Sequence, residues 1–218
     1  MTDLHTLLES SSSRHTHLCP RQVLGVRMGQ AGAAALGMDI RRKDKRMLVI
    51  LETDGCFADG VEVATGCTVG HRTLRVEDYG KIAATFIEVK TGRAFRLAPS
   101  LDVREHARRY APDEHRHYFA QREGYQRMPI DELFTVQEVA LTRPVQEIVS
   151  RPGLRVNCDI CGEEIINERE LYHEHLTLCR GCAAPAYYAP AALFPNEVQG
   201  TEWSEIVRPL AHWVTSDR

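Results

Sequence analysis

The chain has 218 residues, of which 43% are hydrophobic and 26% charged, and this composition excludes a disordered protein. The formal net charge of −3 gives no long-range attraction to nucleic acid, so we do not expect a nucleic-acid partner. The N-terminal residues lack a secretory signal pattern and no apolar stretch is long enough to cross a bilayer, so we expect a cytoplasmic protein without a membrane partner.

The N-terminal third of the chain predicts a flexible lead, a helix and a strand. Residues 1–14 end in a run of serines and are expected to be the lead. A helix is predicted from Pro20 to about residue 37, because proline is tolerated at the first helical position and Cys19 can serve as the N-cap. The short apolar run 46–53 is rich in β-branched residues and predicts a buried strand.

The middle of the chain predicts a further alternation of helices and strands. A helix is expected over 57–66 and two strands joined at the turn "KTGR" over 81–100. Residues 101–123 predict two helices divided by a proline, and residues 133–145 return to strand character. This order favours an α+β fold over a regular βαβ series.

The cysteines fall into two sets. Seven is an odd number and no export signal is present, so a disulfide framework is not expected. Three cysteines are scattered through the first third of the chain, and four fall close together near its end. The expected organisation is therefore a flexible N-terminal lead (1–14), an α+β core domain (15–150), a small cysteine-rich domain (151–190) and a C-terminal tail (191–218).

Two Cys-x2-Cys pairs, separated by 17 residues, predict a metal site. Each pair places two sulfurs on one side of a tight turn, and together they complete the tetrahedron of thiolates that zinc prefers. A filled shell leaves no position for a substrate, so the zinc is expected to be structural, in a treble-clef arrangement of knuckle, hairpin and helix. Alternatives are His175 in place of one cysteine, or an iron–sulfur cluster. The predicted ligands are Cys158, Cys161, Cys179 and Cys182.

A second candidate site involves the histidines and cysteines of the first third. His15, His17 and Cys19 alternate at period two, so their side chains can share a face, and Cys56 approaches from a second helix start. They could hold a second metal ion. Alternatively, Cys56, Cys19 and His17 are candidate catalytic residues, with Cys56 or Cys19 as nucleophile or redox thiol. The simpler interpretation is a capping cysteine with surface histidines. Cys67 is interpreted as a helix-end residue within reach of Cys56.

The remaining motifs give less information about function. No phosphate-binding loop, nucleophile elbow or H-E-x-x-H helix is present. His106, His115 and His117 stand among charged residues and are interpreted as solvated helix surface. The stretch 201–214 spaces its large apolar residues helically, which indicates packing on the chain itself or docking on a second subunit or another protein.

Three blocks in order resemble the FmdE family, named for one of the subunits of formylmethanofuran dehydrogenase. They are "HTHLCPRQVLGVRMG", "DGCFADGVEVATGCTVG" and "DYGKIA", and the likeness extends from about residue 15 to 190. The resemblance implies an α+β core followed by a treble-clef zinc finger, and a dimer built through the core. It also implies a core site at the positions His15, His17, Cys19 and Cys56.

The resemblance implies an accessory metal-binding or redox protein, associated with a molybdenum or tungsten formylmethanofuran dehydrogenase-type system. One alternative is a thiol- or metal-dependent enzyme acting at Cys19 and Cys56. Another is a DksA-like transcription-related protein, since "CDICGEEI" and "CRGC" also resemble that finger. The cysteine-rich block is not basic, which disfavours direct contact with nucleic acid.

Overall fold

The structure is a computed structural model that describes residues 3–15, 17–40 and 44–189. The chain forms two compact units that divide between Val149 and Ser150, beside the linker expected from the sequence. The first unit mixes helices with a sheet, as the predicted α+β class requires. No helix within the described ranges has the length and apolar character needed to cross a membrane.

A five-stranded sheet forms the centre of the first unit, with the strand order β2-β1-β3-β4-β5. The β1–β2 pair is parallel and the other neighbours are antiparallel. The predicted turn "KTGR" joins β3 to β4, so the sequence located this hairpin correctly. The strands are β1 (Met47–Leu51), β2 (Leu74–Val76), β3 (Ala84–Glu88), β4 (Ala94–Pro99) and β5 (Phe134–Val139).

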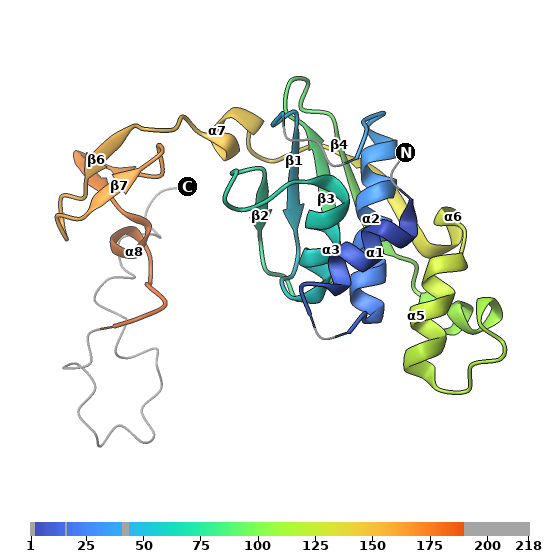
Figure 1. Cartoon of the computed structure of the whole chain (residues 1–218). Helices are drawn as coiled ribbons and strands as arrows, with labels where there is room; N and C mark the ends of the chain where they lie inside the picture. Colours follow the sequence, from blue (N-terminus) through green and yellow to red (C-terminus); the bar gives the residue numbers. More distant parts are fainter. Residues whose placement is uncertain (1–2, 16, 41–43, 190–218) are drawn as a thin grey trace, which may run out of the picture. The chain divides into compact units, whose positions relative to one another are not determined.

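Helices α1, α2 and α3 pack together over one face of the sheet (Figure 1). The helix predicted to start at Pro20 is confirmed as α2, and the helix predicted to close at Gly66 is confirmed as α3, with that glycine at its C-cap. The helical elements of this unit are α1 (Leu4–Ser12), α2 (Pro20–Ala35), α3 (Cys56–Thr65), α4 (Val103–His106), the 3-10 helix η1 (Ala107–Tyr110), α5 (His117–Arg127), α6 (Ile130–Leu133) and α7 (Val145–Val149).

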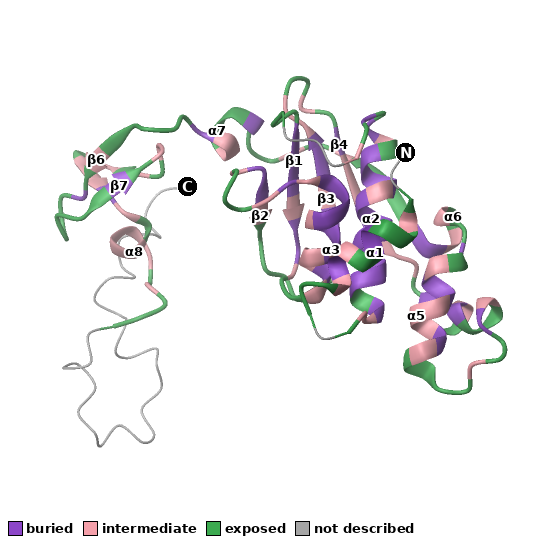
Figure 2. Cartoon of the chain, viewed as in Figure 1, coloured by how far each residue is buried: buried purple, intermediate pink, exposed green. Residues whose placement is uncertain are grey.

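Helix α2 runs through the middle of the hydrophobic core and is buried on most of its surface (Figure 2). Val23, Val26 and Met28 are completely inaccessible to solvent. On the sheet below, Phe86 of β3 occupies the space that a side chain at Gly32 would need. The core therefore forms between α2 and the central strands, and α3 covers the helix from the side.

Helices α2 and α3 approach each other closely at two glycines. A Cβ atom on Gly25 would meet the carbonyl oxygen of Phe57 well inside van der Waals contact, and one on Gly60 would meet the carbonyl of Gln22. Only hydrogen fits at these positions, so the two backbones touch. This contact holds the N-terminal halves of both helices in one place, which matters for the cysteines at their starts.

The first residues differ from the sequence expectation. Residues 1–14 are expected to form a flexible lead, but Leu4–Ser12 form helix α1, and Leu7 is fully buried. The buried Gln22 side chain of α2 donates to the carbonyl of Ser11 at 2.9 Å. The apolar spacing of the leucines outweighs the low helix propensity of the serines, because tertiary packing overrides propensity.

In its described part, residues 150–189, the second unit consists of two short hairpins and one helical turn. Its small core contains Cys158, Ile165 and Leu178. The elements are β6 (Arg155–Asn157), β7 (Glu164–Ile166), β8 (Leu171–His173), β9 (Leu176–Leu178) and α8 (Arg180–Ala183). The apolar segment 201–214, with its helical spacing of large residues, lies outside the described residues.

Candidate metal centre and core thiol pair

The first Cys-x2-Cys pair forms a knuckle between β6 and β7. The backbone N–H of Gly162 donates to the carbonyl of Cys158 at 2.9 Å, and this glycine has a φ of +75°. A residue with a Cβ rarely adopts that conformation, so glycine directly after Cys161 lets the chain turn back sharply. The turn brings the first two sulfurs to the same side of the loop.

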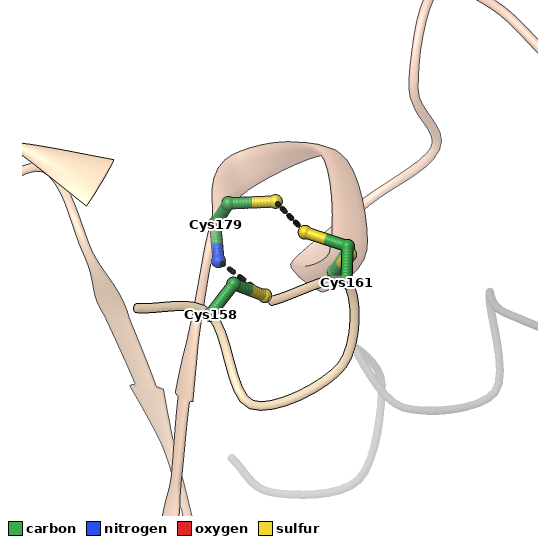
Figure 3. A group of neighbouring side chains, drawn as sticks. Cys158, Cys161 and Cys179 are labelled. Carbon is green, nitrogen blue, oxygen red and sulfur yellow. Dashed lines mark hydrogen bonds between the residues drawn. The ribbon is translucent and has the colours of Figure 1, made fainter. Parts of the chain in front are cut away.

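The second pair belongs to the start of α8. Cys179 directly precedes the helix and Cys182 lies within its single turn. The sulfurs of all four cysteines lie within 4.8 Å of one another, and the Sγ atoms of Cys161 and Cys179 are 3.9 Å apart (Figure 3). A zinc ion at about 2.3 Å from each of four thiolates requires sulfur–sulfur distances of about 3.8 Å. The four side chains therefore fit a tetrahedral metal ion.

The backbone around the cluster favours the thiolate form of Cys158. Burial by itself raises the pKa of this thiol, but backbone N–H donors outweigh burial and hold the pKa at about 6. One donor is the N–H of Cys179, 3.3 Å from the Cys158 sulfur (Figure 3). Burial and hydrogen bonds with the other cysteines raise the pKa of Cys182. A bound cation would relieve this crowding of negative charge.

Asp159 ties the knuckle to the second hairpin. Its backbone N–H donates to the carbonyl of Thr177 at 2.8 Å, and the N–H of Thr177 donates to its carboxylate at 2.6 Å. Because Thr177 lies two residues before Cys179, this pair of bonds sets the distance between the two halves of the site. His175 is exposed, with 83% of its side chain accessible, and it is not part of the cluster, so the candidate ligands are the four sulfurs.

The core candidates begin with Cys19, which is the N-cap of α2 as predicted. Its sulfur accepts the backbone N–H of Gln22 at 3.4 Å, and the Gln22 side chain accepts the backbone N–H of Cys19 at 2.8 Å. These reciprocal bonds form a capping box in which sulfur takes the place of the usual hydroxyl oxygen. The Cys19 side chain is thereby held at the helix start.

Cys56 is the first residue of α3, and its thiol interacts with that of Cys19. Burial, and then the contact with Cys19, raise the pKa of the Cys56 thiol. Tyr118 of α5, which is 41% exposed, interacts electrostatically with both sulfurs, and burial raises the pKa of its hydroxyl. The structure thus brings Cys19 and Cys56 close together, within electrostatic range of a tyrosine that no sequence motif predicted.

The histidines do not complete a ligand set with this pair. His15 is exposed, and its Nε2 lies 2.6 Å from a carboxylate oxygen of Asp59, one turn along α3 from Cys56. His17 is also exposed. Among the described residues, the four cysteines of the second unit are the one group of three or more His, Cys, Asp or Glu side chains close enough to share a metal ion.

Cys67 is separated from this pair by the length of α3. It follows the C-terminal end of the helix, is buried, and its sulfur contacts the carbonyl of Met47 at 3.6 Å. Ten helical residues at about 1.5 Å each put its start and end roughly 15 Å apart. The expected reach between Cys67 and Cys56 is therefore not found.

The fold and the cysteine cluster together define an α+β protein with a C-terminal metal-binding site. The sequence profile of the family described as "FmdE, Molybdenum formylmethanofuran dehydrogenase operon" matches residues 14–148. The chain belongs to the FmdE family.

A relative and a solved structure are similar to the chain. A protein of Archaeoglobus fulgidus named "Probable S-adenosyl-L-methionine-binding protein" is 34% identical over 125 residues. The aligned region makes up 56% of this chain but only 34% of the relative. The crystal structure of a tungsten formylmethanofuran dehydrogenase FmdE-like protein from Syntrophus aciditrophicus has a TM-score of 0.58 and 20% identity, and covers 86% of this chain and 96% of its own. At that identity, the match supports the fold alone.

Proposed function

We propose that the protein is a metal-binding accessory protein of the FmdE family. In this proposal the second unit is a treble-clef zinc finger, in which Cys158, Cys161, Cys179 and Cys182 hold a structural Zn²⁺ ion. The observation that carries the proposal is the gathering of four sulfurs, from two separate chain segments, at the spacing that a tetrahedral ion needs. Bound zinc would join the knuckle to α8 and stabilise a unit whose apolar core is small.

The second part of the proposal concerns the core. Cys19 and Cys56 form its chemical centre, either as ligands of a second metal ion or as a redox thiol pair, with His15 and His17 as additional candidate ligands. Contact between the two thiols supports this assignment. In its present arrangement the pair offers two ligands, so a core metal would need the histidines to turn toward it.

We propose association with a molybdenum or tungsten formylmethanofuran dehydrogenase-type system, which the family description supports. We propose the role of an accessory subunit, acting as a homodimer formed through the core, in the cytoplasm. A protein partner contacting the finger or the C-terminal tail is part of the same proposal. Light scattering on the purified chain tests the dimer, and a molar mass of one chain across a tenfold concentration range would exclude it.

Metal analysis tests both sites. We expect one zinc per chain in protein purified without added metal, and loss of that zinc when Cys158 and Cys182 are both replaced by serine. A second metal that disappears in the C19S/C56S double variant would locate a core metal. Cys67→Ser is the matched control, because this buried cysteine belongs to neither site. Wild-type protein that contains no zinc after purification and does not bind it on titration would refute the finger assignment.

Two alternatives are less well supported. A thiol enzyme would benefit from an activated thiolate, whereas the pKa of Cys56 is raised by burial and by Cys19. A DksA-like nucleic-acid-associated finger would need a basic surface. Within residues 155–185, three arginines face one aspartate and five glutamates, and four thiolates on zinc would add negative charge.

A further inference from the structure

The N-terminal starts of α2 and α3 present two thiols to each other. Cys19 caps one helix and Cys56 begins the other. The close contact at Gly25 and Gly60 holds the two backbones together within two turns of both cysteines. The relative position of the two helix starts is therefore fixed by the main chain and does not depend on flexible loops.

The Cys19 sulfur is oriented by a hydrogen bond, which it accepts from the N–H of Gln22. The Cys56 thiol interacts with that of Cys19. Both side chains are partly exposed, so a small reagent can reach them. Cys67 differs in each respect, because it is buried at the other end of α3 with its sulfur against a backbone carbonyl.

We propose that Cys19 and Cys56 are a modification site, at which a low-molecular-weight disulfide converts the two thiols reversibly into an intramolecular disulfide. The thiolate of one cysteine attacks a sulfur of the small disulfide, forms a mixed disulfide and displaces one small thiolate. The second cysteine then attacks the protein sulfur of the mixed disulfide, and the second small thiolate leaves. The two cysteine protons pass to the two departing thiolates, and the two electrons reduce the small disulfide.

This inference deepens the core part of the proposed function, because it assigns redox chemistry to the same two sulfurs. A disulfide leaves neither sulfur available as a thiolate ligand, so oxidation and metal binding at this pair exclude each other. The finger would be unaffected, since its four cysteines belong to another unit. The state of the core could then change without unfolding the zinc site.

Peptide mapping on the zinc-loaded full chain tests the proposal. The protein is incubated with glutathione disulfide, free thiols are alkylated, and the chain is cleaved with trypsin and a glutamate-specific protease. Cleavage after Glu52 and Glu62 separates Cys56, in peptide 53–62, from Cys67. We expect peptide 15–21 linked to peptide 53–62, with a mass two hydrogens below the sum of the reduced peptides. Dithiothreitol should separate them again.

Variants sharpen the result. In Cys56→Ser, we expect Cys19 to carry one glutathione and no cross-link to form, whereas Cys67→Ser should give the wild-type cross-link. Recovery of both peptides without linkage, at glutathione disulfide concentrations that oxidise accessible thiols elsewhere, would overturn the inference. Zinc measured on the same sample separates the two proposals, because a missing cross-link with one zinc per chain leaves the finger assignment intact.

Discussion

Arg27 is a charged side chain placed inside the first unit, where it is only 9% exposed. Its guanidinium donates to the carbonyls of Tyr125, Gln126 and Met128 at 2.9, 2.6 and 2.7 Å. These carbonyls lie at the C-terminal end of α5, where a cation also complements the helix dipole. The arginine therefore connects α2 to α5, and burial lowers its pKa without removing its charge.

Replacing Arg27 by methionine should destabilise the first unit. The change leaves three partly or fully buried carbonyls without their donor, and we expect a loss of about 2–4 kcal/mol in the free energy of unfolding. Urea denaturation followed by circular dichroism measures it. Arg21→Met is the matched control, because that side chain is exposed on the same helix and should change stability by less than about 0.5 kcal/mol. Equal losses in the two variants would contradict the capping role.

The hydrogen bond of the Cys19 sulfur at the start of α2 leads to a second prediction, which concerns stability. Under reducing conditions, Cys19→Ala should lower the free energy of unfolding by about 0.5–2 kcal/mol, because the N–H of Gln22 loses its acceptor. Cys19→Ser should retain wild-type stability or exceed it, since a hydroxyl is the better cap. Urea denaturation of the alanine and serine variants measures the two free energies of unfolding. Similar destabilisation by alanine and serine would mean that the cap bond contributes nothing.

Some features of the two candidate sites could be predicted from the sequence, and others could not. The grouping of the four cysteines of the second unit follows from spacing alone, since short Cys-x2-Cys loops constrain their own geometry. The cap at Cys19 follows from the proline after it. The proximity of Cys19 to Cys56 could be predicted from the sequence, because both residues lie at helix starts. Tyr118 belongs to α5, about 60 residues further along the chain, and no local sequence pattern identifies it as a neighbour of the two cysteines.

At the scale of helices, the α2–α3 contact depends on the absence of side chains. Gly25→Ala should lower the free energy of unfolding by at least about 2 kcal/mol, because the new methyl group meets the rigid backbone at Phe57. Gly70→Ala is the control, since its Cβ would enter open space and no strained backbone angle is involved. Thermal unfolding of both variants measures the difference. A stable Gly25→Ala protein would show that the helices can move apart at low cost.

Helix α1 supports a separate prediction, because the sequence suggested a flexible segment there. Leu7→Ala should cost about 2–5 kcal/mol if this leucine is part of the core, as its complete burial indicates. His5→Ala changes an exposed position two residues away on the same helix and should be close to neutral. Chemical denaturation compares the two. A neutral Leu7→Ala would show that α1 does not contribute to the folded core.

Elements with strong local signals were predictable, and those defined by distant partners were not. Helix α2, helix α3 and the β3–β4 hairpin follow from caps, turn residues and periodicity. Strand β2 has only three residues and exists because β1 offers a parallel edge to it. In the lead, Leu4, Leu7 and Leu8 already had helical spacing, but the neighbouring serines carried more weight in the prediction than this pattern.

For the whole molecule, the proposed zinc site predicts that metal removal affects only one unit. If the four cysteines hold zinc as proposed, a chelator that extracts it should unfold residues 150–189, because their apolar core is small and includes the cysteines themselves. The first unit, with its own large core, should remain folded. Hydrogen exchange resolved by peptide measures this, with added zinc restoring protection as the control. Loss of protection in β1 and β3 on chelation would show that the two units do not fold independently.

The position of β5 at the edge of the sheet has a consequence for folding and for aggregation. Residues 100–133 must be arranged before β5 can pair with β4, whereas β3 and β4 need only a short turn. Closing the longer segment costs more chain entropy, so we expect β5 to join a sheet that is already formed. In the reverse direction, loss of this outer strand would leave the edge of β4 unpaired. An unpaired edge can accept a strand from another molecule, so resistance to aggregation depends on the β4–β5 pairing.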